Sequence, residues 1–365
     1  MLIIFNKRTD LWLNEGFATW IQYLSIDKCF PEWNVWSFYP TEIIGEALDF
    51  DSLRNSHPVQ MRVCSPGDLP EIFDSISYCK GSCIIRMLNC MMGDEAFRDA
   101  LRGYFQKFQY KNTITQDLWA SLSEKSDQDI QNLMNNWTKS AGYPLVSVSL
   151  EQNKTDGCTW LCLSQRRYFK NSTQVIVKRF NCNNDDNNLY FAYNLKESSR
   201  NELWKIPIFI DISLRFFKNS LLEDQCTKLN LGKLSPEQRS SIFVNPKIVG
   251  FYRVLYSKEM FDSLLASANL FSSNAAAEHR IGFISDTFAL TCSNHLSSYD
   301  LFRLLWVLRN EKCPHVWKFL LDNVHILLKR LVDTHLFEQS LAFFSILMQT
   351  IVAEIGFEEG EDDGD

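Results

Sequence analysis

The sequence lacks any apolar run long enough to cross a membrane. Residues 1–5 are apolar, but Asn6, Lys7 and Arg8 end that run far short of a signal-peptide core, and no later run reaches spanning length. We therefore expect no membrane span and no secretory signal in these residues.

It also lacks an excess of positive charge. Lysine and arginine together number 37 against 44 aspartates and glutamates, which leaves a formal net charge of −7. No basic stripe with interleaved aromatic residues offsets this balance, although such a stripe is typical of a nucleic-acid-binding surface. The composition therefore argues against nucleic acid as a partner.

The eleven cysteines form no paired framework. Their number is odd, whereas disulfide-rich secreted domains normally show an even count. Cys79 and Cys83 are separated by three residues, as are Cys158 and Cys162, but structural zinc knuckles use Cys-x-x-Cys pairs. We therefore expect reduced, mostly packed thiols, no structural zinc site and a cytoplasmic protein.

A histidine pair of the kind that binds zinc is missing as well. In His-Glu-x-x-His two histidines share one helix face, and no His-x-x-x-His occurs in this sequence. A lone histidine is more often a packed or surface residue than a metal ligand. The six single histidines are His57, His279, His295, His315, His325 and His335.

The bulk numbers are those of a globular protein of several parts. Apolar residues make up 45% and charged residues 22% of the chain, which is ordinary for a folded protein. A length of 365 residues is too great for one ordinary core. We therefore expect two or three domains.

Residues 10–20, Asp-Leu-Trp-Leu-Asn-Glu-Gly-Phe-Ala-Thr-Trp, predict a helix with a carboxylate outside its apolar stripe. Glu15 falls among small and polar residues on the opposite side. From the face alone, such a glutamate is expected to point to water. The expected stripe consists of Leu13, Phe17, Trp20, Ile21 and Leu24.

The segment Leu-Trp-Leu-Asn-Glu-Gly-Phe-Ala-Thr-Trp resembles the segment that carries the third zinc ligand in the M1 (gluzincin) metallo-aminopeptidases. The resemblance implies that Glu15 is a ligand of one Zn²⁺ ion. In that family His-Glu-x-x-His lies roughly eighteen residues upstream of this glutamate, and only fourteen residues precede Glu15 here. We therefore expect the chain to lack the N-terminal part of the catalytic domain, with the two histidine ligands and the general-base glutamate.

A second sequence segment strengthens the resemblance. Residues 73–81, Phe-Asp-Ser-Ile-Ser-Tyr-Cys-Lys-Gly, resemble the segment in which M1 enzymes place a tyrosine over the scissile carbonyl, in the same order relative to Glu15. The resemblance implies that Tyr78 is catalytic and donates a hydrogen bond to the developing oxyanion. The match is strongest over residues 9–150 and favours the branch that contains puromycin-sensitive aminopeptidase.

The resemblance and the hydrophobic periods together predict a mainly α, multidomain fold. Residues 1–143 are expected to form the C-terminal part of a thermolysin-like α-helical catalytic domain. A period of two from residue 144 predicts a small β-sandwich over 144–232. Residues 233–357 are expected to form a truncated α-solenoid, and 358–365 an acidic tail. The helices of the solenoid are expected at 258–270, 275–291, 298–309, 315–330 and 334–355.

The resemblance implies a zinc-dependent aminopeptidase that removes N-terminal residues from peptide substrates, here as a fragment that is not catalytically self-sufficient. The alternative is a non-catalytic scaffold, derived from an aminopeptidase, that binds peptides or proteins. An epoxide-hydrolysing relative of the leukotriene A4 hydrolase type shares both sequence segments, but the expected β-sandwich favours the puromycin-sensitive branch. The sequence does not indicate an oligomeric state.

Overall fold

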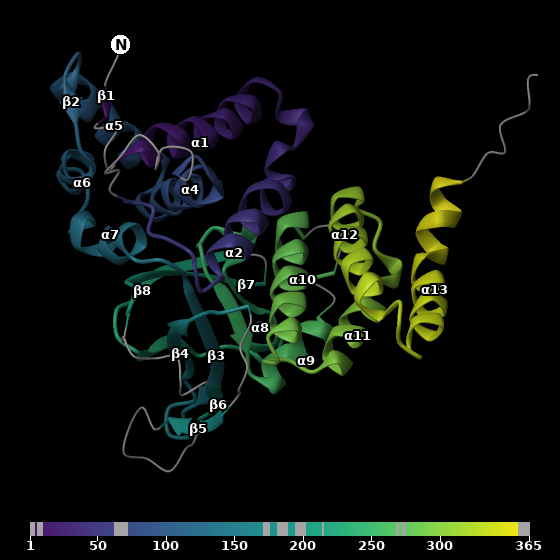
Figure 1. Cartoon of the computed structure of the whole chain (residues 1–365). Helices are drawn as coiled ribbons and strands as arrows, with labels where there is room; N and C mark the ends of the chain where they lie inside the picture. The colour runs from purple at the N-terminus through teal and green to yellow at the C-terminus, as the bar shows by residue number, and fades with distance from the viewer. Residues whose placement is uncertain are drawn as a thin grey trace, which may run out of the picture.

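The computed structural model describes residues 4–5, 10–61, 72–170, 176–180, 189–193, 202–213, 215–267, 270–271 and 275–356. The chain is mainly helical with small sheets. The N-terminal helices lie above the sheets, and the C-terminal helices stand beside them (Figure 1). None of the helices in these ranges is long and apolar enough to cross a membrane, as the sequence predicts.

Helices make up most of the described N-terminal region. Local sequence explains where they begin: the Asp129 carboxylate caps one helix by accepting from the backbone N–H of Asn132. Gly93, at φ 84°, allows a sharp turn between two others. The elements are α1 (Leu11–Cys29), η1 (Pro31–Trp33), η2 (Val35–Ser37), η3 (Pro40–Ile44), α2 (Gly45–Asp51), η5 (Ile76–Lys80), α4 (Gly81–Met92), α5 (Asp94–Phe108), α6 (Thr115–Ser123) and α7 (Ile130–Lys139).

Two sheets follow. The larger has the order β11-β3-β4-β9, in which β11 runs parallel to β3 and the other pairs are antiparallel. The smaller has the antiparallel order β10-β7-β8. The strands are β3 (Pro144–Gln152), β4 (Thr159–Arg167), β7 (Ile206–Ile212), β8 (Arg215–Leu222), β9 (Cys226–Gly232), β10 (Ile242–Val244) and β11 (Arg253–Tyr256). Two short pairs stand apart: β1 (Ile4–Phe5) with β2 (Asn112–Thr113), and β5 (Ile176–Phe180) with β6 (Leu189–Tyr193).

A tyrosine hydroxyl joins the two sheets, and β3 of the larger sheet is buried. The Tyr256 hydroxyl, on β11, accepts from the Val244 backbone N–H and donates to the Val244 carbonyl, on β10, at 2.9 and 3.1 Å. In β3 the apolar Val146 and Val148 are buried, and so are the serines between them, Ser147 and Ser149. The alternation of valine and serine therefore does not separate an exposed face from a buried one, because β3 is covered on both sides.

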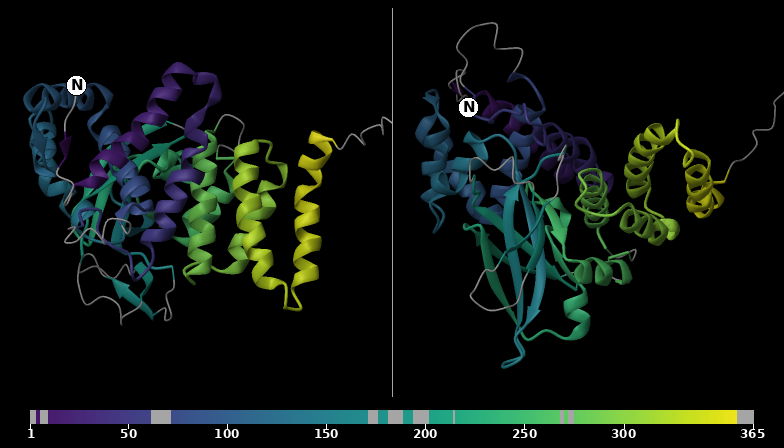
Figure 2. Two further views of the ribbon diagram at one scale, coloured as in Figure 1. Left: turned by 45° about the horizontal axis from the view of Figure 1, so that its top comes forward. Right: turned by 60° about the horizontal axis from the view of Figure 1, so that its bottom comes forward.

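The C-terminal helices stand side by side in Figure 2, which shows α10, α12 and α13 as neighbouring rods. They begin and end within a few residues of the expected positions, since their apolar periods and caps agree; Ser257 and Ser297, for example, cap α9 and α11. The helices are α8 (Pro236–Ser240), α9 (Lys258–Ala266), α10 (Ala277–Cys292), α11 (Ser298–Val307), α12 (Pro314–Leu331) and α13 (Phe337–Ile355), with the 3-10 turns η6 (Pro246–Ile248) and η7 (Leu308–Asn310).

Two strands cross the boundary expected from sequence. The helical region was expected from residue 233, yet β10 pairs with β7 and β11 pairs with β3. Each sheet therefore takes one strand from beyond that boundary. The expected acidic tail, 358–365, lies outside the described residues.

Candidate functional site

Helix α1 holds Glu15 just after its first turn. The helix begins after Asp10, whose buried carboxylate accepts hydrogen bonds from Gln60 Nε2 and the Thr115 backbone N–H at 3.2 and 3.3 Å. The Thr115 hydroxyl bonds to the same oxygen. Three groups from two distant segments thus fix the start of α1, and with it the place of Glu15.

A contact between two glycines brings α1 against α4. A Cβ atom on Gly16 would lie 2.8 Å from the Gly81 carbonyl carbon, closer than real Cβ contacts allow. Only glycine lets the two backbones approach this closely. Since Glu15 precedes Gly16 and Tyr78 lies three residues before Gly81, the crossing places the carboxylate and the phenol on neighbouring turns.

Tyr78 lies in the π-helical turn η5, Ile76–Lys80, which leads into α4. Such turns are rare and are frequent at functional sites. The Asp74 carboxylate oxygen Oδ1 caps this turn by accepting from the backbone N–H groups of Ile76 and Ser77, at 3.0 and 3.1 Å. The turn is therefore held by a side chain as well as by its own backbone.

Glu15 and Tyr78 are in contact, and both side chains are half-buried. Desolvation raises the pKa of Tyr78 above 10.0, and the hydrogen bond to the Glu15 carboxylate and its negative charge raise this pKa further. The phenol therefore keeps its proton at neutral pH, and it donates that proton to an acceptor. The arrangement joins a carboxylate that could bind a cation to a hydrogen-bond donor.

The buried face of α1 differs from the expected stripe. Trp12 and Leu13 are 0% exposed, whereas Ile21 is 45% exposed. The reason is that α1 is covered on two sides: Gly16 packs on α4, while Trp12 packs on Trp119 of α6, with ring centroids 6.0 Å apart. On the side of Glu15, Ala18 and Gln22 are exposed, whereas Gly16, next to Glu15, forms the helix contact.

The described residues do not supply a zinc site by themselves. Within them no group of three or more histidine, cysteine, aspartate or glutamate side chains is arranged to hold a metal ion. A stable catalytic zinc site needs about three protein ligands, and Glu15 is one carboxylate. The part of the chain that the structure describes therefore holds no complete zinc site.

Sequence reasoning missed the charged residues that hold the turn of Tyr78. The Lys80 ammonium, at the end of η5, lies 2.8 Å from Asp51 Oδ2, and both side chains are 0% exposed. His57 Nε2 lies 2.7 Å from Asp74 Oδ2 at the start of the turn. The signal available in the sequence for the first pair was Lys80 itself, a lysine at helical spacing between the apolar Ile76 and Ile84.

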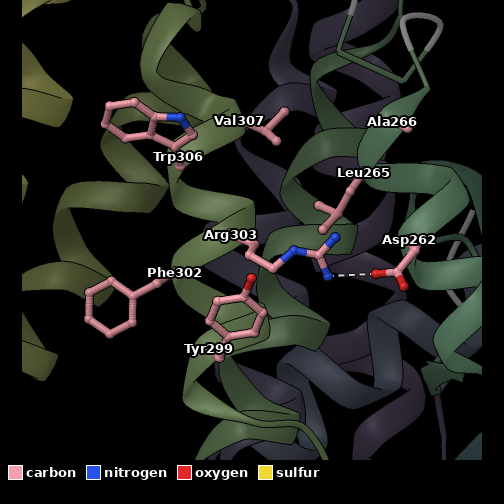
Figure 3. Close-up of a pocket in the computed structure, with 8 residues that line it drawn as sticks. All are labelled: Asp262, Leu265, Ala266, Tyr299, Phe302, Arg303, Trp306 and Val307. Atoms are coloured by element: carbon pink, nitrogen blue, oxygen red, sulfur yellow. Dashed lines mark hydrogen bonds and ion pairs between the residues drawn. The ribbon is translucent and has the colours of Figure 1, made fainter.

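A groove lies between α9 and α11, away from Glu15 and Tyr78. Its volume is about 430 Å³. Figure 3 shows Arg303 pointing toward Asp262 across it, with an N–O distance of 2.5 Å, and Lys258 also pairs with Asp262 at 2.8 Å. The Asp262 carboxylate is therefore engaged in ion pairs. The aromatic residues on the α11 side of the groove are Tyr299, Phe302 and Trp306.

Two protein-family models match the chain. The Peptidase family M1 domain matches residues 2–137, which include Glu15 and Tyr78. The ERAP1-like C-terminal domain matches residues 241–365. The matched ranges lie on either side of the segment that holds most of the sheet strands.

Curated relatives align across that segment as well. Alanine/arginine aminopeptidase of Saccharomyces cerevisiae is 33% identical over 370 residues, covering 99% of this chain and 38% of the relative. Puromycin-sensitive aminopeptidase of Caenorhabditis elegans is 29% identical over 372 residues, covering 99% of this chain and 36% of the relative. Aminopeptidase M1 of Arabidopsis thaliana is 32% identical over 315 residues, covering 85% and 33%. The chain spans about a third of the length of these relatives, and it belongs to the M1 peptidase family.

Proposed function

We propose that this chain is part of a zinc-dependent aminopeptidase of the M1 type, which hydrolyses N-terminal residues from peptides. The observation that carries the proposal is the contact between Glu15 and Tyr78 at the crossing of α1 and α4. The names of the relatives favour a hydrolase over a binding scaffold, since each is an aminopeptidase.

Glu15 is the proposed metal ligand of this chain. Its carboxylate is half-buried and its helix is fixed at both Asp10 and Gly16, so it is held in place before a metal arrives. Because the sequence contains no His-x-x-x-His, the remaining ligands and the general base of the proposed site come from outside it. The chain is therefore proposed not to be catalytically self-sufficient.

Tyr78 is the proposed catalytic residue. When water attacks a peptide carbonyl, negative charge develops on its oxygen, and a fixed donor there is worth about 3 kcal/mol. Burial and Glu15 raise the pKa of Tyr78, so the phenol remains a donor across the neutral range. Its π-helical turn, capped by Asp74, keeps the hydroxyl from moving away.

The three regions take proposed roles from the same family. Residues 1–143 form the C-terminal part of the catalytic domain, 144–232 a β-sandwich, 233–357 a truncated helical solenoid and 358–365 an acidic tail. The family models at 2–137 and 241–365 support the first and third assignments. The sandwich and solenoid position the catalytic region and carry no chemistry.

Peptides are the proposed substrates and the cytoplasm the proposed location. Cys79, Cys83 and Cys90 are free thiols, which is typical of a reducing compartment. One relative, of Saccharomyces cerevisiae, is named Aminopeptidase 2, mitochondrial, so location varies among the relatives.

Zinc content and hydrolysis of an aminoacyl-coumarin test the proposal on two proteins. The 365-residue chain is expected to retain no zinc after dialysis and to show no turnover. The protein read from the transcript is expected to carry an in-frame His-Glu-x-x-His roughly eighteen residues before Glu15, to bind about one zinc and to lose turnover in Glu15→Gln. Absence of that segment from the transcript, or full activity of Glu15→Gln, would overturn the proposal.

A titration tests the geometry without activity. In Glu15→Gln the pKa of Tyr78 is expected to fall toward 10.0, because the neighbouring negative charge is gone. Ultraviolet difference titration of the chain measures this pKa, with Tyr78→Phe identifying the signal. An unchanged Tyr78 pKa would show that the two side chains are not in contact.

A further inference from the structure

The turn that carries Tyr78 depends on one carboxylate. Asp74 Oδ1 accepts from the backbone N–H groups of Ile76 and Ser77, and the Asp74 carbonyl accepts from the Tyr78 N–H at 3.1 Å. Movement of Asp74 therefore moves three consecutive anchors of the segment that ends at the phenol.

His57 holds that carboxylate from another part of the chain. Its Nε2 atom lies 2.7 Å from Asp74 Oδ2, and its Nδ1 atom lies 2.9 Å from the Pro58 carbonyl oxygen. An ionised carboxylate and a carbonyl only accept hydrogen bonds. Both ring nitrogens must therefore carry a proton to satisfy both contacts, which is the imidazolium form.

The surroundings allow this ring to exchange protons with water. The His57 and Asp74 side chains are 22% and 29% exposed. The charges of Asp74 and Asp51 both act on His57, and Asp51 is itself paired with the buried Lys80 at the far end of η5. Asp51 also accepts from the Ser56 hydroxyl at 2.5 Å, next to His57. One short segment thus clamps both ends of the turn.

We propose that His57 and Asp74 are positioning residues for Tyr78, and that the protonation state of His57 sets the placement of the phenol against Glu15. The inference rests on the proposed function only for the catalytic meaning of that placement. When His57 loses a proton, its ring has one N–H for two acceptors, so either Pro58 or Asp74 loses its hydrogen bond. The Asp74 cap then loosens, and the turn shifts.

The pKa shifts of His57 and Asp74 favour the charged form of both side chains. The hydrogen bond to Asp74 raises the pKa of His57 above 6.5 against the opposing effect of burial. Burial alone would raise the pKa of Asp74, but the hydrogen bonds from His57 and the backbone N–H groups, with the charge of the ring, lower it below 3.8. The ion pair of His57 and Asp74 is thus complete at pH values between the pKa of Asp74 and the pKa of His57, and it is lost as pH rises through the pKa of His57.

Nuclear magnetic resonance of the 365-residue chain tests the proposal, with tyrosine labelled at Cζ and backbone amides labelled with ¹⁵N. Tyr78→Phe assigns the tyrosine signal. Between pH 5.5 and 8.5 the Tyr78 carbon and the Ile76 and Ser77 amides are expected to shift together, with one midpoint above 6.5 that equals the midpoint of the His57 ring itself.

Three variants separate charge from structure. His57→Gln keeps a donor for Asp74 and cannot titrate, so the Tyr78 shift should become independent of pH. Asp74→Asn keeps a cap oxygen and removes the charge, so the midpoint should fall. His335→Gln, the same change at an exposed residue between α12 and α13, should behave as the unaltered chain.

The outcomes are distinguishable. Tyr78 and amide signals that do not change with pH in the unaltered chain would overturn the proposal, whether or not any variant folds. A pH-dependent Tyr78 signal that persists in folded His57→Gln would also overturn it. Failure of the complete protein to bind zinc or to hydrolyse peptides would remove the proposed function and would leave these shifts unchanged.

Discussion

Lys80 and Asp51 are two opposite charges that water does not reach. Removing one partner of such a pair leaves the other charge buried and uncompensated, which costs about 3–5 kcal/mol. Lys80→Met is therefore expected to lower the free energy of unfolding by about that amount, because Asp51 Oδ2 loses its partner at 2.8 Å. Urea unfolding monitored by tryptophan fluorescence measures the change.

The matched control is the same substitution at an exposed pair. Lys170 lies 2.8 Å from Asp49, but the two side chains are 32% and 57% exposed. Lys170→Met is expected to change the free energy of unfolding by less than about 1 kcal/mol. Equal losses in the two variants would show that Lys80 contributes no more than a surface charge.

At the residue level, resemblance identified Glu15 and Tyr78, and their contact agrees with the proposed pairing, but their roles stay predictions. Pattern alone assigned Glu15 to a water-facing side. It could not find His57 or Asp51, because a single histidine in a loop and a single aspartate at the end of a short helix have no periodicity that marks them. Their partners, Asp74 and Lys80, lie 17 and 29 positions away in the chain.

At the level of the elements, the crossing of α1 and α4 can be tested by substituting its glycines. In Gly16→Ala the new methyl would lie 2.8 Å from the Gly81 backbone, so the helices must separate. Overpacking of this kind costs about 1–3 kcal/mol. Thermal unfolding should show the loss, and the pKa of Tyr78 should move toward 10.0 as Glu15 is displaced.

A second glycine supplies the control. Gly103 lies within α5, and nothing lies within 4 Å of a Cβ atom added there. Gly103→Ala is expected to stabilise the chain by about 1 kcal/mol, because alanine favours a helix. If Gly16→Ala stabilised the chain to the same degree, the close contact of α1 and α4 would be wrong.

Helix positions followed from the sequence better than helix faces did. The C-terminal helices have apolar periods and serine caps close together in the chain, so their bounds were predictable to within a few residues. The face of α1 depended on Gly81 and Trp119, which are distant in sequence. A stripe drawn from one helix cannot include what its neighbours cover.

At the scale of the whole molecule, a few polar contacts join the regions. The Arg86 guanidinium of α4 donates to the carbonyls of Lys247 and Ile248, at 3.1 and 2.8 Å, and so links the N-terminal helices to η6. β10 and β11 extend both sheets from beyond the expected boundary. Strands this short carry too few residues to show a period of two, and the sequence therefore predicted the sheet region without its final strands.

His295 makes the contact between the sheets and the C-terminal helices sensitive to acid. Its ring lies beside Tyr168, which follows β4, and the Tyr168 hydroxyl donates to the Ala289 carbonyl of α10 at 2.9 Å. Burial, and to a smaller degree the positive charge of Arg166, lower the pKa of His295 from 6.5 to about 4. The folded chain therefore prefers the neutral ring.

The sign of the pH effect follows from that preference. A histidine whose pKa is lowered by folding contributes its full stability above its unfolded pKa, and this contribution is lost as pH falls toward the folded value. Between pH 7.5 and 4 the free energy of unfolding should fall by about 3 kcal/mol on account of His295. His295→Gln should lack this part of the loss, whereas His325→Gln, at an exposed position of α12, should retain it. Urea unfolding at both pH values measures each difference, and equal slopes for the two variants would mean that His295 is free to take up a proton in the folded chain.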